Sequence, residues 1–219
     1  MTFVKICGLR TPDDVDAAVA AGADAVGFVM SSRSPRHVTP GLARALVDRV
    51  GGRALTVLVT NELALADAVA QTRATGVDVL QLHGPTYDAA AFASAAEAGV
   101  RTWRATSLAA DPEPRTGSYG EEALLLDSPD PGSGHRWTAS DLRARPTGRW
   151  LLAGGLDPDN VADAIAELAP WGVDVSSGVE VSRGVKDHDR VRAFVAAVRQ
   201  TAGTRSSAQS PQSPAPGAR

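Results

Sequence analysis

The chain has 219 residues, of which 43% are hydrophobic and 21% charged, and its formal net charge is −3. This length suits one α/β domain with a sizeable core, and the mild acidity excludes a basic surface for nucleic acid or anionic membranes. Cys7 is the single cysteine, so no internal disulfide can form, and we expect a cytoplasmic location. No charged n-region precedes an apolar stretch, so we expect no signal peptide.

Short β-branched runs alternate with alanine-rich segments along the chain. The runs predict strands at residues 3–7, 25–30, 55–60, 79–82, 102–105, 123–127, 150–153 and 173–176. Apolar residues spaced three and four apart predict helices at residues 13–21, 41–50, 62–75, 157–168 and 185–201. Thr11-Pro12 and Asp157-Pro158 each place a capping side chain before a first-turn proline.

The alternation predicts a single (β/α)8 TIM barrel over residues 1–202, and an open doubly wound sheet is the alternative. No G-x-G-x-x-G follows the first strand, which argues against dinucleotide binding. Residues 106–122 are rich in Pro, Gly and acidic side chains, so the helix after strand five is expected to be short or missing. Residues 203–219 hold no large apolar side chain and are expected to form a disordered tail.

In such a barrel the active site lies at the carboxyl ends of the strands. Gly154 and Gly155 follow the seventh strand, and Ser176, Ser177 and Gly178 end the eighth. Loops of this kind let backbone amides approach a phosphate, and barrels often bind a substrate phosphate there. Simple turns between strand and helix are the alternative, but the paired signature favours a phosphate site.

Cys7 ends the first strand and is a candidate reactive thiol. Side chains alternate along a strand, so Phe3, Lys5 and Cys7 share one face. A nearby ammonium lowers a thiol pKa, and Lys5 is therefore expected to favour the thiolate. Asp174 lies on the eighth strand, beside the first in a closed barrel, and is expected near Lys5. The alternatives are a buried apolar Cys7 and a Schiff-base role for Lys5.

Three further strand-end residues are candidates for the site. Asp127 follows an apolar strand, and burial would raise its pKa and keep it protonated; a helix cap is the alternative. Arg36 follows Pro35 and could bind a carboxylate, although a solvated surface arginine is the commoner case. His83 could act as a base or be a hydrogen-bonded structural histidine at the rim. The four histidines lie apart in sequence without metal-ligand spacing.

These residues belong to an ordered set of motifs that resembles the phosphoribosylanthranilate isomerase family of tryptophan biosynthesis. The set spans nearly the whole folded body and consists of Val4-Lys5-Ile6-Cys7-Gly8-Leu9, Gly27-Phe28-Val29, Ser34-Pro35-Arg36, Gln81-Leu82-His83-Gly84, Leu125-Leu126-Asp127-Ser128, Gly132-Ser133-Gly134 with Trp137, Leu152-Ala153-Gly154-Gly155-Leu156, Asp174-Val175-Ser176-Ser177-Gly178-Val179-Glu180 and Gly184-Val185-Lys186-Asp187.

The resemblance implies an aldose–ketose isomerase that converts N-(5'-phosphoribosyl)anthranilate by an Amadori rearrangement, without cofactor or metal. It implies that Asp127 is the general acid that opens the ring and that Cys7 is the base at C2'. Arg36 would bind the anthranilate carboxylate. The remaining expected substrate contacts are His83, Gly154, Gly155, Ser176, Ser177 and Gly178. We expect a small-molecule substrate as partner, no nucleic acid or membrane, and a monomer or homodimer.

Other barrels offer alternatives of two kinds. A histidine-pathway isomerase would end its first strand in Asp and repeat its halves, a ribulose-phosphate epimerase would need metal ligands, and indole-glycerol-phosphate synthase a lysine-and-glutamate set. A non-catalytic phosphate-binding barrel would keep the glycine loops. It would have no reason to keep both Cys7 and Asp127 at the barrel mouth.

Overall fold

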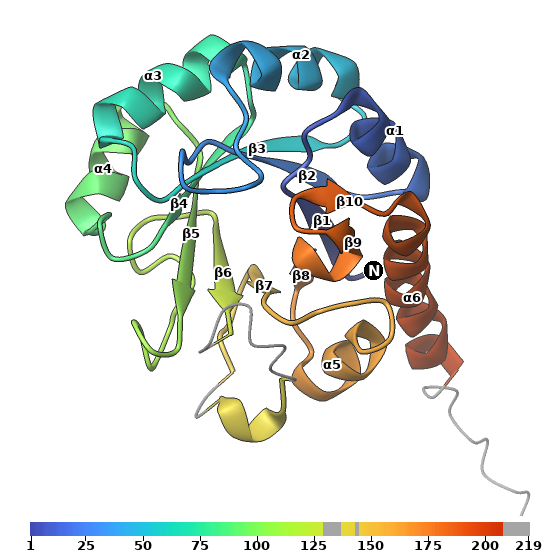
Figure 1. Cartoon of the computed structure of the whole chain (residues 1–219). Helices are drawn as coiled ribbons and strands as arrows, with labels where there is room; N and C mark the ends of the chain where they lie inside the picture. The colour runs from blue at the N-terminus through green and yellow to red at the C-terminus, as the bar shows by residue number, and fades with distance from the viewer. Residues whose placement is uncertain (129–136, 143–144, 208–219) are drawn as a thin grey trace, which may run out of the picture.

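The computed structural model describes residues 1–128, 137–142 and 145–207. Eight parallel strands form a closed barrel, in which the last strand pairs with the first (Figure 1). This closure confirms the predicted TIM barrel and excludes the open sheet. The strands are β1 (Phe3–Cys7), β2 (Ala25–Val29), β3 (Leu55–Thr60), β4 (Val79–His83), β5 (Thr102–Ser107), β6 (Ala123–Asp127), β7 (Trp150–Leu152) and β8 (Gly172–Val175).

Helices cover the outside of the barrel (Figure 1). In the described residues they are α1 (Pro12–Ala21), α2 (Pro40–Val50), α3 (Leu65–Thr75), α4 (Ala89–Glu97), α5 (Val161–Leu168) and α6 (His188–Ser207), with 3-10 turns η1 (Ala139–Asp141) and η2 (Ser177–Val179). Thr11 caps α1 as predicted, because its hydroxyl accepts the Asp14 backbone N–H at 3.1 Å. None of the helices in these ranges is long and apolar enough to cross a membrane.

Helices α5 and α3 begin later than the sequence predicted. Helix α5 begins at Val161 rather than at 157, because Asp157 closes a turn instead of capping the helix. Its carboxylate accepts the backbone N–H groups of Asp159 at 2.8 Å and Asn160 at 3.0 Å. Helix α3 likewise begins at Leu65 rather than at 62.

The end of the chain also differs from its predicted form. Residues 180–186 fold into a hairpin of β9 (Glu180–Ser182) and β10 (Val185–Lys186), so the last helix begins at His188 instead of 185. Helix α6 then continues to Ser207, and residues 203–207 of the expected tail are helical. The rest of that tail, residues 208–219, lies outside the described residues.

The barrel interior is filled by alternate strand residues and becomes polar towards one end. A cluster of mostly small and β-branched side chains fills the middle, including Val57, Val79 and Leu151. At the amino-terminal end the Phe3 ring stacks on Trp171 with centroids 4.4 Å apart. The interior is therefore filled with side chains, which fix the positions of the residues at the opposite, carboxyl ends of the strands.

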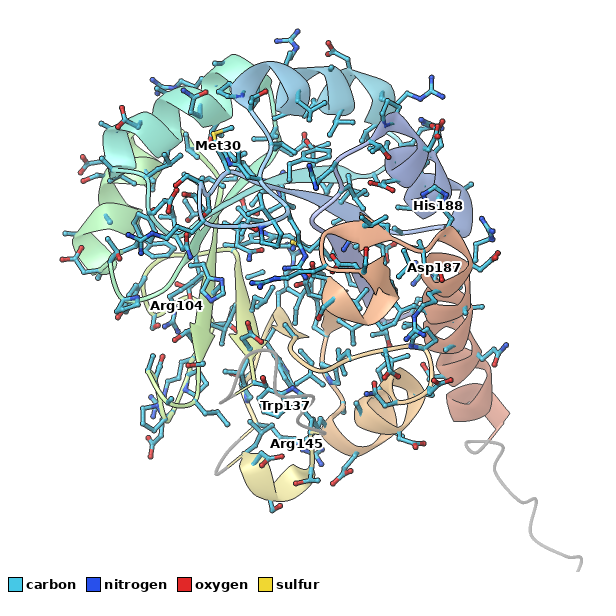
Figure 2. The ribbon with its side chains drawn as sticks, viewed as in Figure 1. Met30, Arg104, Trp137, Arg145, Asp187 and His188 are labelled. Atoms are coloured by element: carbon cyan, nitrogen blue, oxygen red, sulfur yellow. The ribbon has the colours of Figure 1, made fainter. Side chains whose placement is uncertain are left out.

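The helix expected to be short or missing after β5 is missing, since residues 108–122 are all described and hold only turns and bends. A buried charge cluster takes its place on the outer side of β5. The Arg104 side chain, 6% exposed, bonds Glu121 at 3.1 Å and Asp111 at 2.9 Å (Figure 2). Its guanidinium also lies 4.6 Å from the centre of the Tyr119 ring. Ion pairs and one aromatic ring thus cover the outer side of β5, in the place where a helix would otherwise pack.

Candidate active site

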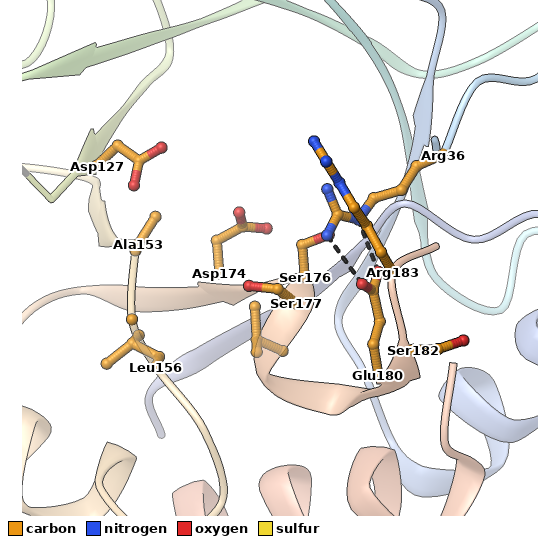
Figure 3. A pocket seen from close by; sticks show the side chains of 13 residues that line it. Arg36, Asp127, Ala153, Leu156, Asp174, Ser176, Ser177, Glu180, Ser182 and Arg183 are labelled. Carbon is orange, nitrogen blue, oxygen red and sulfur yellow. Dashed lines mark hydrogen bonds and ion pairs between the residues drawn. The ribbon is translucent and has the colours of Figure 1, made fainter. Parts of the chain in front are cut away.

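Two adjoining cavities open at the carboxyl ends of the strands. The larger has a volume of about 770 Å³ and is lined by residues after β6, β7 and β8, including Asp127, Gly154, Gly155 and Ser177 (Figure 3). The smaller, of about 210 Å³, is lined by residues that include Cys7, Gln81 and His83. The two share the side chains of Arg36, Asp127, Asp174 and Ser176. Of the eleven residues expected at the site, all but Lys5 and Gly178 line one of these cavities.

Lys5 and Asp174 form the predicted pair inside the barrel. The Lys5 ammonium is fully buried and donates to the Asp174 carboxylate at 2.7 Å, as the register of β1 and β8 requires. Burial is the largest single effect and would lower the pKa of Lys5, but the charges and hydrogen bonds of Asp174 and Cys7 together outweigh it and raise the pKa. The close carboxylate argues against a Schiff-base role, because that chemistry needs a neutral amine.

Cys7 lies next to this pair, but its protonation differs from the prediction. Burial raises the pKa of the Cys7 thiol above its usual value, while Lys5 acts in the expected, lowering direction. Asp174 opposes Lys5, because its negative charge raises the pKa of the thiol. The expectation of a thiolate considered only the cation: Asp174 was correctly expected beside Lys5, but its effect on the thiol and the effect of burial were left out. The free protein therefore holds Cys7 mainly as a thiol at neutral pH.

Asp127 lines the smaller cavity together with Cys7 and His83. Burial raises the pKa of the Asp127 carboxyl, as predicted, although the Ser128 backbone N–H donates to it at 2.8 Å. Burial lowers the pKa of His83, and Asp127 partly opposes this shift. The His83 side chain makes no hydrogen bond with the described part of the chain, unlike the hydrogen-bonded structural histidine that was expected. Its ring is therefore free to contact a ligand.

The loop after β7 is shaped by Gly154. Its φ of 79° lies in the left-handed region, and a Cβ there would come within 2.6 Å of the Ser128 backbone nitrogen. Trp137 holds the same loop from outside, because its indole N–H donates to the carbonyls of Ala153 at 2.7 Å and Gly154 at 3.1 Å (Figure 2). The backbone therefore approaches the cavity where a phosphate was expected. Gly178 instead packs against the Leu156 carbonyl, with no room for a Cβ.

Arg36 is held by an unexpected partner. Its Nε donates to Glu180 at 2.6 Å and its Nη2 donates to the second Glu180 oxygen at 2.8 Å (Figure 3). Lys186 and the Gly184 backbone N–H also donate to Glu180, at 2.9 Å and 3.0 Å. Although burial opposes it, these donors lower the Glu180 pKa to about 2. Arg36 is thus a fixed residue of the site and not a solvated surface arginine.

Sequence reasoning missed four residues around the site. Glu180 and Lys186 lay within the matched motifs but received no role, and only their charge pointed to them. Gln81 lines the smaller cavity, and its buried amide oxygen has no hydrogen-bond partner among the described residues. Gly27 leaves space for the thiol, since a Cβ there would lie 2.9 Å from Cys7 Sγ.

In the described ranges, no three His, Cys, Asp or Glu side chains gather as metal ligands would. Residues 132–134 of the matched motifs lie outside the described residues.

The fold and the site together define a (β/α)8-barrel protein with a thiol, a buried carboxyl and glycine-rich loops at one mouth. The chain belongs to the family described as N-(5'phosphoribosyl)anthranilate (PRA) isomerase, which matches residues 4–197. It is 43% identical over 207 residues to the N-(5'-phosphoribosyl)anthranilate isomerase of Geobacter sp. (strain M21), covering 90% of this chain and 97% of that protein.

Solved structures agree with this assignment. The crystal structure of TrpF from Jonesia denitrificans is 54% identical, with a TM-score of 0.86, and covers 92% of this chain and 98% of its own. A phosphoribosyl anthranilate isomerase crystallised with reduced 1-(o-carboxyphenylamino)-1-deoxyribulose 5-phosphate is 29% identical, with a TM-score of 0.77, and covers 91% of this chain and all of its own.

Proposed function

We propose that this chain catalyses the Amadori rearrangement of N-(5'-phosphoribosyl)anthranilate to 1-(2-carboxyphenylamino)-1-deoxyribulose 5-phosphate, a step of tryptophan biosynthesis. The observation that carries the proposal is the placing of Cys7 and Asp127 on one cavity at the barrel mouth. That cavity shares residues with the larger one beside the β7 and β8 loops. A sugar ring can therefore meet an acid and a base while its phosphate rests on backbone amides.

The first step uses Asp127 as a general acid. Because burial raises its pKa, the carboxyl can hold a proton closer to neutral pH than an exposed aspartate can. It gives this proton to the furanose ring oxygen as the bond between that oxygen and C1' breaks. The anthranilate nitrogen supplies the electron pair, which leaves an open chain with a protonated imine.

The second step uses Cys7 as a general base. The thiolate takes the proton from C2' and the electrons move to the imine nitrogen, which gives an enolamine that tautomerises to the ketone. Burial raises the thiol pKa, so the thiolate is the minor form before substrate binds. The cationic imine lowers that pKa at the moment of reaction, and Lys5 acts in the same direction. These steps use protein groups alone.

We assign the remaining contacts by position. Arg36 is the ligand for the anthranilate carboxylate, and His83 and Ser176 line the cavity between the two ends of the substrate. The backbone near Gly154 and Ser177, with the neighbouring Gly155 and Gly178, is the phosphate site. Three expectations stay predictions: a monomer or homodimer, no nucleic-acid or membrane partner, and a cytoplasmic location.

The test follows the loss of substrate fluorescence with freshly prepared phosphoribosylanthranilate. We expect rapid turnover by the wild type and losses of about 10²- to 10⁴-fold in kcat for Cys7→Ala and for Asp127→Asn. Asp48→Asn is the matched control, because this exposed carboxylate on α2 undergoes the same chemical change. Full activity in both site variants, or no turnover by a folded wild type, would leave a non-catalytic phosphate-binding barrel or another sugar-phosphate isomerase.

A further inference from the structure

The charges that line the larger cavity do not all have partners. Its charged lining residues are Arg36, Asp127, Asp174, Glu180 and Arg183. Asp174 is paired with Lys5 at 2.7 Å, and Glu180 lies between Arg36 and Lys186. Burial favours the neutral form of Asp127. Within the described part of the chain, Arg183 has neither an ion pair nor a counter-charge in hydrogen-bond contact, whereas Arg36, the other cation of the lining, is paired with Glu180.

The N–H donors of Arg36 that Glu180 leaves free can bind only one anionic group. A guanidinium carries five N–H donors in a fixed plane. Glu180 accepts from Nε and from Nη2, so that edge of Arg36 is closed to a ligand. The Nη1 group and one N–H of Nη2 remain, which make a single bidentate edge. The proposed substrate carries two anionic groups, a carboxylate and a phosphate.

The hairpin of β9 and β10 brings Arg183 to the end of the cavity where Arg36 lies. The neighbouring Gly184 donates its backbone N–H to Glu180 at 3.0 Å, and a Cβ on Gly184 would lie 2.8 Å from the Pro35 carbonyl oxygen. The hairpin tip is therefore packed against the loop that carries Arg36. In Figure 3, Asp127 lies at one end of the cavity, and Arg36 and Arg183 lie at the other.

We propose that Arg183 is a second anion-binding side chain of the substrate site, which binds either the carboxylate beside Arg36 or the phosphate beside the backbone amides. This assignment rests on the proposed function. In the free protein the Arg183 guanidinium is exposed and stays hydrated. It gains an oxyanion ligand only when substrate fills the cavity. Arg183 therefore contributes to substrate affinity and takes no part in proton transfer.

The experiment compares steady-state kinetics of Arg183→Ala and Arg183→Lys with those of Arg33→Ala. Arg33 is a matched control, because it is an exposed arginine in the same loop as Arg36 and lines neither cavity. We expect KM to rise about tenfold in Arg183→Ala, as for the loss of one charge-assisted hydrogen bond, while kcat stays within about twofold of the wild type. Lysine restores part of the affinity, and the difference shrinks at about 0.5 M salt.

Two ligands identify the anionic group. The substrate analogue made from aniline lacks the carboxylate, and equal inhibition of wild type and Arg183→Ala by this analogue assigns Arg183 to the carboxylate. Weaker inhibition of Arg183→Ala by both the analogue and inorganic phosphate assigns it to the phosphate. A KM and inhibition constants that match those of Arg33→Ala overturn the assignment while the isomerase function stands. No turnover by the wild type refutes the function instead, and phosphate binding then tests Arg183 alone.

Discussion

Replacing Glu180 with glutamine removes the charge that holds Arg36 and Lys186 together. The pKa of Glu180 falls from 4.5 to about 2 in the folded protein. A difference of about 2.5 pKa units corresponds to about 3 kcal/mol of folding free energy at neutral pH. The Glu180 side chain is only 4% exposed, so solvent screens this interaction little. We therefore expect Glu180→Gln to lower the free energy of unfolding by about 3 kcal/mol at pH 7.

The same difference fixes how the loss depends on pH. Because the folded-state pKa lies below the unfolded value, the stabilisation is complete above about pH 4.5 and is lost as the pH falls through about 2. Urea unfolding of the wild type and Glu180→Gln at pH 7 and near pH 3 tests this dependence. The loss of unfolding free energy in the variant should fall to less than half at the lower pH. Glu122→Gln is the control, because Glu122 pairs with Arg101 at 2.8 Å but its side chain is 35% exposed. Equal penalties for the two variants at pH 7, or a penalty for Glu180→Gln that ignores pH, would refute the reasoning.

Two further predictions concern the proton transfers and the barrel wall. With raised pKa values for both Asp127 and Cys7, kcat/KM should rise from acid pH, level off, and fall only above about pH 8.5; a fall that begins below pH 7 would mean a lowered thiol pKa. Arg104→Met leaves the buried Glu121 unpaired and should cost about 3–5 kcal/mol in urea unfolding with kcat/KM nearly unchanged. Arg101→Met, at an exposed pair, is the control, and an equal cost would contradict the cluster's role.

The barrel and much of its mouth could be predicted from sequence because both depend on local rules. Alternation along a strand and closure of eight strands were enough to place Lys5 beside Asp174. Strand ends gave Cys7 and Asp127, because parallel strands bring their carboxyl ends to one edge. The Thr11 cap and the missing helix after β5 also followed from neighbouring residues alone.

The remaining features depend on distances between distant segments and on depth of burial. The pairing of Arg36 with Glu180 joins residues 144 positions apart, and no periodicity encodes it. The direction of the Cys7 pKa depends on how burial and two opposite charges balance, which requires coordinates. Asp157 shows a limit of local rules, because a capping residue before a proline formed a turn instead of starting the helix.

The pairing of the first and last segments has a consequence for how the protein folds. Lys5 meets Asp174 across 169 positions, and Arg199 donates to the Thr2 carbonyl across 197. Contacts of such large sequence separation form late, because the chain must first lose the entropy of closing a long loop. A nascent or truncated chain that lacks its last quarter has Cys7 without Asp174 and Arg36 without Glu180. Catalytic competence is therefore acquired only when the ring of strands closes, and turnover reports the completed fold.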